Sequence, residues 1–256
     1  MILSKSMIHN MGNRLLFRSN FQQKGNVCLL TSYGFIIEYY SNLSGMKMSS
    51  SFFPDLFKGY LHGIAQCISN LLTPTLEKEL EQRFADRYQG YRAVLDGTIV
   101  IDVLSREELE ELAFKVFHFF CQDVCSIVKN RAGGIHGFEH IHCINCYAHN
   151  SATHSIGKVV LPSNYVMGDV SIASNQGIPI DEIKVFLKKD EHSLALLLFQ
   201  SAPGGNYHSV VCGYDKDGFY FRDPNCKKPT KTTYNGLTLD KLTCFEYIPI
   251  SYLGQI

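Results

Sequence analysis

The chain of 256 residues is 45% hydrophobic and 12% aromatic, which is enough to build a buried core and excludes a disordered protein. Its 24 basic and 24 acidic side chains cancel, so net charge gives no indication of binding to nucleic acid or to a membrane surface. No run approaches the roughly 18–20 apolar residues of a membrane span, and the first twenty residues lack the apolar centre of a secretory signal.

Nine cysteines are a high and odd number for such a chain. Without a secretory signal, they indicate reduced thiols in a cytosol-like compartment, where a cysteine can serve as nucleophile, metal ligand or core residue. A disulfide framework is the less favoured interpretation.

Residues 1–24 are polar and irregular and are predicted to form a lead-in segment to one domain over residues 25–256. From Cys28 to about Asn42 the run CLLTSYGFIIEYYSN is apolar at helical spacing. A helix is therefore expected to begin at or just before the cysteine.

Two further helices are predicted from start signals. Thr73 and Pro74 give an N-cap residue and a proline at the first helical position, and this helix is expected to run to about Gln89. Ser105 and Glu108 have the spacing of a capping box. The apolar face of the helix that follows them comprises Leu109, Leu112, Val116, Phe120 and Val124.

Residues 130–157, rich in Gly, His, Asn and Cys, are predicted to form loop, and strand-like runs follow them. The predicted strands are Lys158–Leu161, Leu194–Gln200, Tyr207–Tyr214, Phe219–Arg222 and Thr243–Ile248, with turns at Pro203-Gly204-Gly205 and Asp215-Lys216-Asp217-Gly218. Helices first and an antiparallel sheet last predict an α+β domain.

Two distant segments combine into a candidate site. A thiol at a helix N-terminus, as expected for Cys28, meets the positive end of the helix dipole, which favours the nucleophilic thiolate. His208 begins one predicted strand and Asp223 ends the next, 15 residues later. A hairpin turning at residues 215–218 brings them to the same end of the sheet, where a base and its orienting carboxylate must lie.

This pairing resembles the papain-like cysteine peptidase superfamily, and more narrowly the YopT/AvrPphB-type effector peptidases of bacteria. In those families a Cys begins the N-terminal helix, and a His-containing strand is followed by one ending in Asp-Pro-Asn, here Asp223-Pro224-Asn225. The resemblance covers roughly residues 20–42 and 194–249. It implies a papain-like catalytic domain over 25–256 with Cys28 as nucleophile, His208 as base and Asp223 as the residue that orients it.

The resemblance also implies an oxyanion-hole glutamine a few residues before the nucleophile. Gln22 fits this role, with Gln23 as a close alternative, and Asn225 is expected to support the Asp223 turn. The 180 residues between Cys28 and His208 imply an elaborated helical and loop region at about 45–157. The Trp that often follows the nucleophile is absent, since the chain has none.

The activity implied is that of a thiol hydrolase or acyl transferase acting on a protein substrate, as a bacterial effector cysteine protease. Deamidation and transglutamination share the same acyl-enzyme chemistry and remain open. The alternative is a catalytically inactive protein-binding module, zinc-stabilised or not, in which the triad is vestigial. Taken alone, Cys28, flanked by Val27, Leu29 and Leu30, also fits a core residue.

A second cluster holds seven His and Cys side chains within 19 residues: His136, His140, His142, Cys143, Cys146, His149 and His154. Cys143 and Cys146 with His140 and His142 are compatible with a structural zinc site of four ligands, although the spacing matches no standard finger. A His-rich loop without metal is the favoured interpretation, so no cofactor is required.

The resemblance further implies a protein made in the bacterial cytoplasm and delivered to the host cytosol, with a host protein as its substrate. The region 45–157 is expected to select that substrate. The competing hypothesis is a peptidase that trims its own lead-in, since residues 1–21 look polar enough to be removed without exposing core.

Overall fold

The computed structural model describes residues 13–124, 127, 165–169, 171–172, 177–200 and 207–253. The chain forms two compact units. The first, the sheet unit, comprises Met1–Gln23, Cys28–Ser50 and Leu161–Ile256; the second, the helical unit, comprises Lys24–Val27 and Ser51–Val160. The short segment 24–27 therefore belongs to the helical unit while its two neighbours in sequence belong to the sheet unit.

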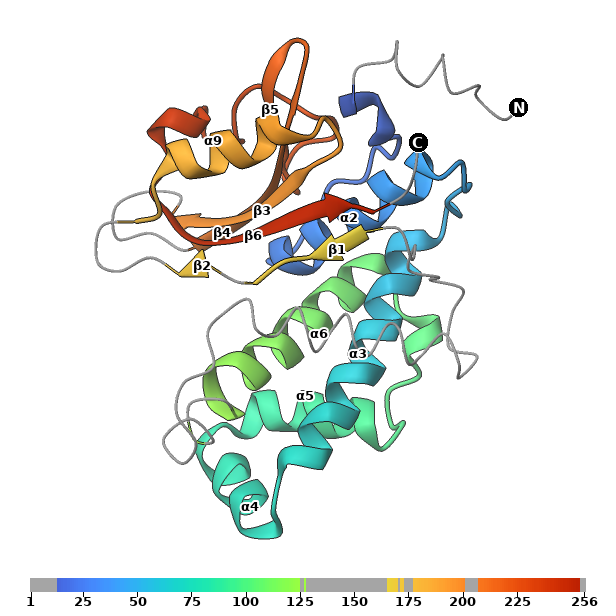
Figure 1. Cartoon of the computed structure of the whole chain (residues 1–256). Helices are drawn as coiled ribbons and strands as arrows, with labels where there is room; N and C mark the ends of the chain where they lie inside the picture. The colour runs from blue at the N-terminus through green and yellow to red at the C-terminus, as the bar shows by residue number, and fades with distance from the viewer. Residues whose placement is uncertain are drawn as a thin grey trace. The chain divides into compact units, whose positions relative to one another are not determined.

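The sheet unit is built on one antiparallel sheet (Figure 1), in which β1, β6, β3, β4 and β5 are neighbours in that order and β2 pairs with β6. Its strands are β1 (Tyr165–Met167), β2 (Ser171–Ile172), β3 (Leu194–Gln200), β4 (Tyr207–Asp215), β5 (Gly218–Arg222) and β6 (Cys244–Tyr252). Mixed helices and an antiparallel sheet confirm the predicted α+β class. Four of the predicted strands are confirmed, β3 over its full length, whereas Lys158–Leu161 and the turn at 203–205 lie outside the described residues.

Both faces of the sheet are apolar because a helix covers each one (Figure 1). The helix α9 (Ile180–Lys189) buries Ile183 and Leu187 in one core cluster with alternate residues of the strands, among them Leu197 and Val210. The helix α2 (Cys28–Leu43) packs on β4 and β3 and is buried at every position from Leu29 onward. A helix that is buried on every side is expected only in such an interior position.

The predicted hairpin between β4 and β5 is confirmed. Asp215 pairs with Gly218 across a two-residue loop, and Gly218 has φ 102°, a conformation that favours glycine. Continuing the register, Val211 pairs with Arg222, so His208 and Asp223 come to the same end of the two strands.

The described part of the lead-in segment, from residue 13 onward, contributes apolar side chains to the core. A 3-10 turn, η1 (Asn13–Leu16), buries Leu16, and Phe17 is 5% exposed beside the rings of Phe35, Tyr39 and Tyr220. The expectation that residues 1–21 can be removed without exposing core is therefore wrong for the described part of that segment. The segment is polar in overall composition, so the sequence did not indicate that Leu16 and Phe17 are buried.

The helical unit packs α3 against α5 and α6. Its helices are α3 (Phe52–Leu71), α4 (Pro74–Arg83), α5 (Ala85–Leu95) and α6 (Arg106–His118), with short turns η2 (Ile101–Val103) and η3 (Phe119–Val124), the latter π-helical. The predicted capping box is confirmed, because the Ser105 hydroxyl accepts from Glu108 N–H and the Glu108 carboxylate accepts from Ser105 N–H. The predicted apolar face of this helix is buried.

Three features of the helices differ from prediction. The helix expected from Thr73 to Gln89 is two helices, because Phe84 leaves helical geometry (φ −135°, ψ 41°) between buried Leu80 and buried Tyr88. No Gly or Pro marks this break, so tertiary packing imposes it. Helices α3 and α9 were not predicted, although the spacing of Phe53, Phe57, Leu61, Ile64 and Ile68 is a helical signal that could have indicated α3.

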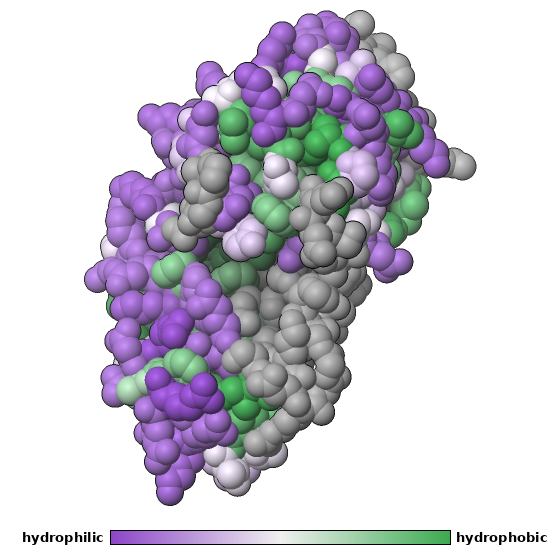
Figure 2. Space-filling model, turned by 90° about the vertical axis from the view of Figure 1, so that its left-hand side faces the viewer, coloured by the Kyte–Doolittle hydropathy of each residue, from purple (hydrophilic) through white to green (hydrophobic). Residues whose placement is uncertain are grey.

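None of the described helices is long and apolar enough to cross a membrane. Among the residues coloured by hydropathy in Figure 2, hydrophilic ones predominate, with smaller hydrophobic areas between them.

Candidate active site

Cys28 is the first residue of α2 and is half-buried, in contrast to the fully buried residues that follow it. Its position at the start of a 16-residue helix is the one predicted. The positive end of the helix dipole and the peptide N–H groups of the first turn therefore lie beside the thiol.

His208 lies at the start of β4, with 5% of its surface exposed, and interacts with both other members of the predicted triad. Its Nε2 lies 2.9 Å from Oδ1 of Asp223, and the Cys28 side chain lies near enough to contribute to the shift of the His208 pKa. The structure thus brings together the three residues that the sequence placed 15 and 180 positions apart.

The carboxylate of Asp223 is fully buried and has a partner at each oxygen. Oδ1 accepts from His208 Nε2 and from the backbone N–H of Asn225 at 2.8 Å, while Oδ2 accepts from the backbone N–H of Tyr234 at 3.0 Å. The Tyr234 ring also meets the His208 ring edge-to-face, with centroids 5.0 Å apart. These contacts hold the carboxylate, and through it the imidazole, in one orientation.

Burial by itself would lower the pKa of His208. The hydrogen bonds with Asp223 and Cys28, reinforced by their negative charges, outweigh burial and raise the pKa from 6.5 to about 9. The imidazole is therefore protonated at neutral pH in the resting site.

Both predicted oxyanion glutamines lie against Asn225. Gln22 Nε2 donates to the Asn225 backbone carbonyl at 2.7 Å, and Gln23 Nε2 donates to Asn225 Oδ1 at 3.2 Å. Gln23 N–H also donates to the Pro224 carbonyl at 2.9 Å. Asn225 thus joins the segment before the nucleophile to the turn after Asp223, which is a larger role than the supporting one predicted.

Arg222 is a fully buried cation that the sequence analysis missed. Its guanidinium donates to the carbonyls of Phe21, Ser19, Asp223 and Cys226, and lies 3.7 Å from the centre of the Phe35 ring. Burial lowers its pKa to about 10, although the Glu38 carboxylate opposes this shift. Arg222 ties the lead-in segment to the Asp223 turn. Its place as the last residue of β5 gave no sign of this.

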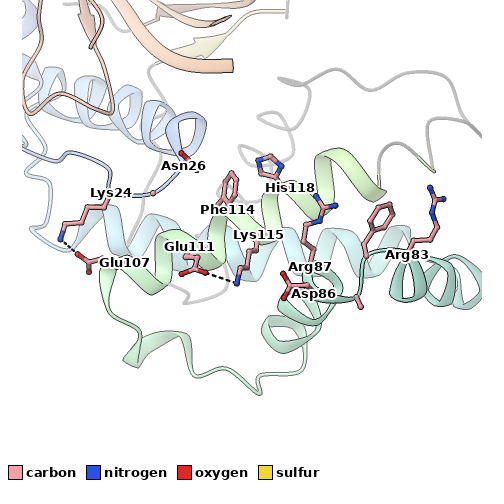
Figure 3. A pocket seen from close by; sticks show the side chains of 13 residues that line it. Lys24, Asn26, Arg83, Asp86, Arg87, Glu107, Glu111, Phe114, Lys115 and His118 are labelled. Carbon is pink, nitrogen blue, oxygen red and sulfur yellow. Dashed lines mark hydrogen bonds and ion pairs between the residues drawn. The ribbon is translucent and has the colours of Figure 1, made fainter. Parts of the chain in front are cut away.

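The helical unit has a cavity of about 920 Å³ lined by residues of segment 24–26, α4, α5 and α6 and of the junction between α4 and α5. In Figure 3 the lining side chains extend from Lys24 and Glu107 at one end of the cavity to Arg83 at the other end, with the ring of Phe114 between them. Asn26, one of the lining residues, is two residues before Cys28, so chain connectivity alone keeps their Cα atoms within about 7 Å.

The zinc candidates His140, His142, Cys143 and Cys146 lie outside the described residues. Within the described part of the chain, no group of three or more His, Cys, Asp or Glu side chains is placed to hold a metal ion.

The chain matches no known family model, no curated protein and no solved structure.

Proposed function

We propose that the protein is a thiol hydrolase or acyl transferase of papain-like type, with Cys28 as nucleophile, His208 as general base and acid, and Asp223 as the residue that orients His208. The observation that carries the proposal is the hydrogen bond of 2.9 Å between buried His208 and Asp223, with the Cys28 side chain near enough to His208 to help raise its pKa. Covalent acyl transfer requires a nucleophile, a base beside it and a third group that orients the base.

In the proposed reaction the Cys28 proton resides on His208, and the thiolate attacks the carbonyl carbon of a substrate amide. With Nε2 held by Asp223, Nδ1 is the nitrogen that exchanges this proton. The tetrahedral intermediate collapses when His208 protonates the leaving amine, which gives a thioester on Cys28. Water, deprotonated by His208, then releases the acid, or an amine takes its place.

Peptide cleavage, side-chain deamidation and transglutamination are three outcomes of this one pathway, and they differ only in the leaving and entering groups. We infer peptide cleavage as the main reaction from the resemblance to effector peptidases. Products from a host-cell lysate distinguish the three reactions by mass spectrometry, as new N-termini, as Gln-to-Glu changes or as cross-links.

We infer that Gln23, rather than Gln22, supplies the oxyanion amide. Gln23 is 9% exposed, and its Oε1 is buried without a hydrogen-bond partner among the described residues. Rotating the side-chain amides of Gln23 and Asn225 together preserves the bond between them and turns the Gln23 NH2 group toward the unpartnered position. We propose that a donor at this position is the one that meets the developing oxyanion.

We infer that the cavity of the helical unit binds a segment of the protein substrate. It combines the rings of Phe84 and Phe114 with charged groups of both signs, a mixture suited to an extended peptide. A host protein as substrate and delivery from a bacterium to the host cytosol remain parts of this proposal that rest on the resemblance.

Alkylation by iodoacetamide near neutral pH, mapped by mass spectrometry, tests the thiol chemistry. Cys28 should react faster than Cys67 and Cys226, which are also half-buried, and His208→Ala should remove that preference. Cys226 is a suitable internal control because burial raises its pKa. Similar rates at the three thiols would overturn the proposal and favour the inactive binding module.

A further inference from the structure

The segment between the oxyanion glutamines and the nucleophile is held by one carboxylate of the helical unit. Glu110, on α6, accepts the backbone N–H of Lys24 and the backbone N–H of Gly25 at the same oxygen, Oε2, each at 2.7 Å. Its other oxygen, Oε1, accepts from Arg106 Nε at 2.8 Å. Glu110 and these two backbone N–H groups form a clamp on the segment. Lys24 and Gly25 lie four and three residues before Cys28, so the clamp acts close to the nucleophile along the chain.

Glu110 has no exposed surface. A carboxylate buried to this extent is costly unless it is paired and hydrogen-bonded, and here a cation and two peptide groups meet that requirement. Two of the three donors belong to the segment before Cys28. The main effect of the buried charge is therefore to fix the course of that backbone.

Further contacts hold the same segment to the helical unit. The Lys24 ammonium pairs with Glu107, one turn before Glu110 on α6. The exposed ion pair contributes little by itself, so the hydrogen bonds to Glu110 are the principal restraint. On the other side, Gln23 is bonded to Pro224 and Asn225 of the sheet unit.

We propose that Glu110 is a positioning residue for the nucleophile. It fixes the backbone at Lys24 and Gly25, and through three intervening peptide bonds it sets where Cys28 enters α2 relative to Gln23. This inference rests on the function proposed above and adds a role for the helical unit in that function. The unit shapes the nucleophile loop as well as a cavity beside it.

Glu110→Gln tests the proposal because it keeps the size of the side chain and removes the charge. A Gln amide presents an NH2 group either to Arg106 or to the two backbone N–H groups, so one set of donors faces another donor. Glu108→Gln is the matched control: it is the same change on the same helix, and Glu108 also accepts a backbone N–H, that of Ser105.

Two readouts separate the clamp from the chemistry. Amide hydrogen exchange at Lys24 and Gly25 should become faster in Glu110→Gln and stay unchanged in Glu108→Gln. The rate of Cys28 alkylation by iodoacetamide should fall by roughly 10- to 100-fold in Glu110→Gln alone, since misplacement by about 1 Å has effects of this size. Glu110→Asp, which retains the charge but shortens the reach, should show both effects in smaller degree and serves if Glu110→Gln does not fold.

A folded Glu110→Gln protein with unchanged alkylation of Cys28 would overturn the positioning role. Unchanged exchange at Lys24 and Gly25 would overturn the clamp itself. A failure of the proposed function gives a different result. In that case Cys28 of the wild type reacts with iodoacetamide no faster than Cys226, while hydrogen exchange at Lys24 and Gly25 still becomes faster in Glu110→Gln.

Discussion

His208 Nε2 and Asp223 Oδ1 lie 2.9 Å apart, and both side chains are buried. This hydrogen bond fixes one ring nitrogen and, with the carboxylate charge, favours the protonated imidazole. The bond therefore determines both the orientation of the base and the pH range in which it carries a proton.

Asp223→Asn should lower the pKa of His208 from about 9 toward its ordinary value of 6.5, because the negative partner is removed while an acceptor oxygen is retained. Titration of the His208 ring by NMR in the wild type and in the variant measures the shift. Asp217→Asn, in the loop of the β4–β5 hairpin, provides the control. An unshifted His208 in Asp223→Asn would show that the carboxylate does not set the protonation of the base.

Stability should depend on pH through the same histidine. A group whose pKa rises on folding stabilises the native state below its unfolded pKa, here 6.5, and this contribution disappears as pH rises through about 9. Relative to His208→Gln, the wild type should lose free energy of unfolding between pH 6.5 and 9. Urea titrations of both proteins across this range measure the difference. Parallel pH dependence would contradict the raised pKa.

Gln23→Ala should slow acylation by p-nitrophenyl acetate by roughly 10²- to 10³-fold, since an oxyanion donor is lost. Alkylation by iodoacetamide passes through no oxyanion and should change little. Gln22→Ala is the matched control, expected to have the smaller effect on acylation. Equal and small losses in the two variants would remove the oxyanion assignment from both glutamines.

Phe114→Ser should impair recognition of a peptide without impairing the thiol, because Phe114 lines the cavity of the helical unit. The measurement is the ratio of Cys28 inactivation by a peptidyl chloromethyl ketone to that by iodoacetamide, which should fall several-fold. Phe117→Ser is the control on the same helix, also half-buried but outside the cavity lining. Equal ratios in the two variants would place the peptide elsewhere.

Phe17→Ala should destabilise the protein by about 3–5 kcal/mol, the usual cost of removing a buried aromatic ring. Leu15, two residues earlier, is 53% exposed, and Leu15→Ala should change the free energy of unfolding by no more than about 0.5 kcal/mol. Urea unfolding compares the two variants. Similar small losses would mean that the lead-in can be detached, as self-processing requires.

The sequence by itself determined the elements whose signals are local. Apolar spacing after Cys28, the capping box at Ser105 and the turn ending in Gly218 each act through neighbouring residues, and each is present as predicted. The order of Cys, His and Asp with one hairpin between the last two was sufficient to place His208 beside Asp223.

Only the tertiary structure decided the partners that lie far apart in the chain. Glu110 reaches Lys24 and Gly25 across 85 or more residues, and Arg222 reaches Phe21 across 201. Nothing in a Glu on a charged helix or an Arg at the end of a strand distinguishes it from a solvated side chain. A charge removed from water is stable only when it is hydrogen-bonded. The partners of these two buried charges are therefore the groups that the tertiary structure places beside them.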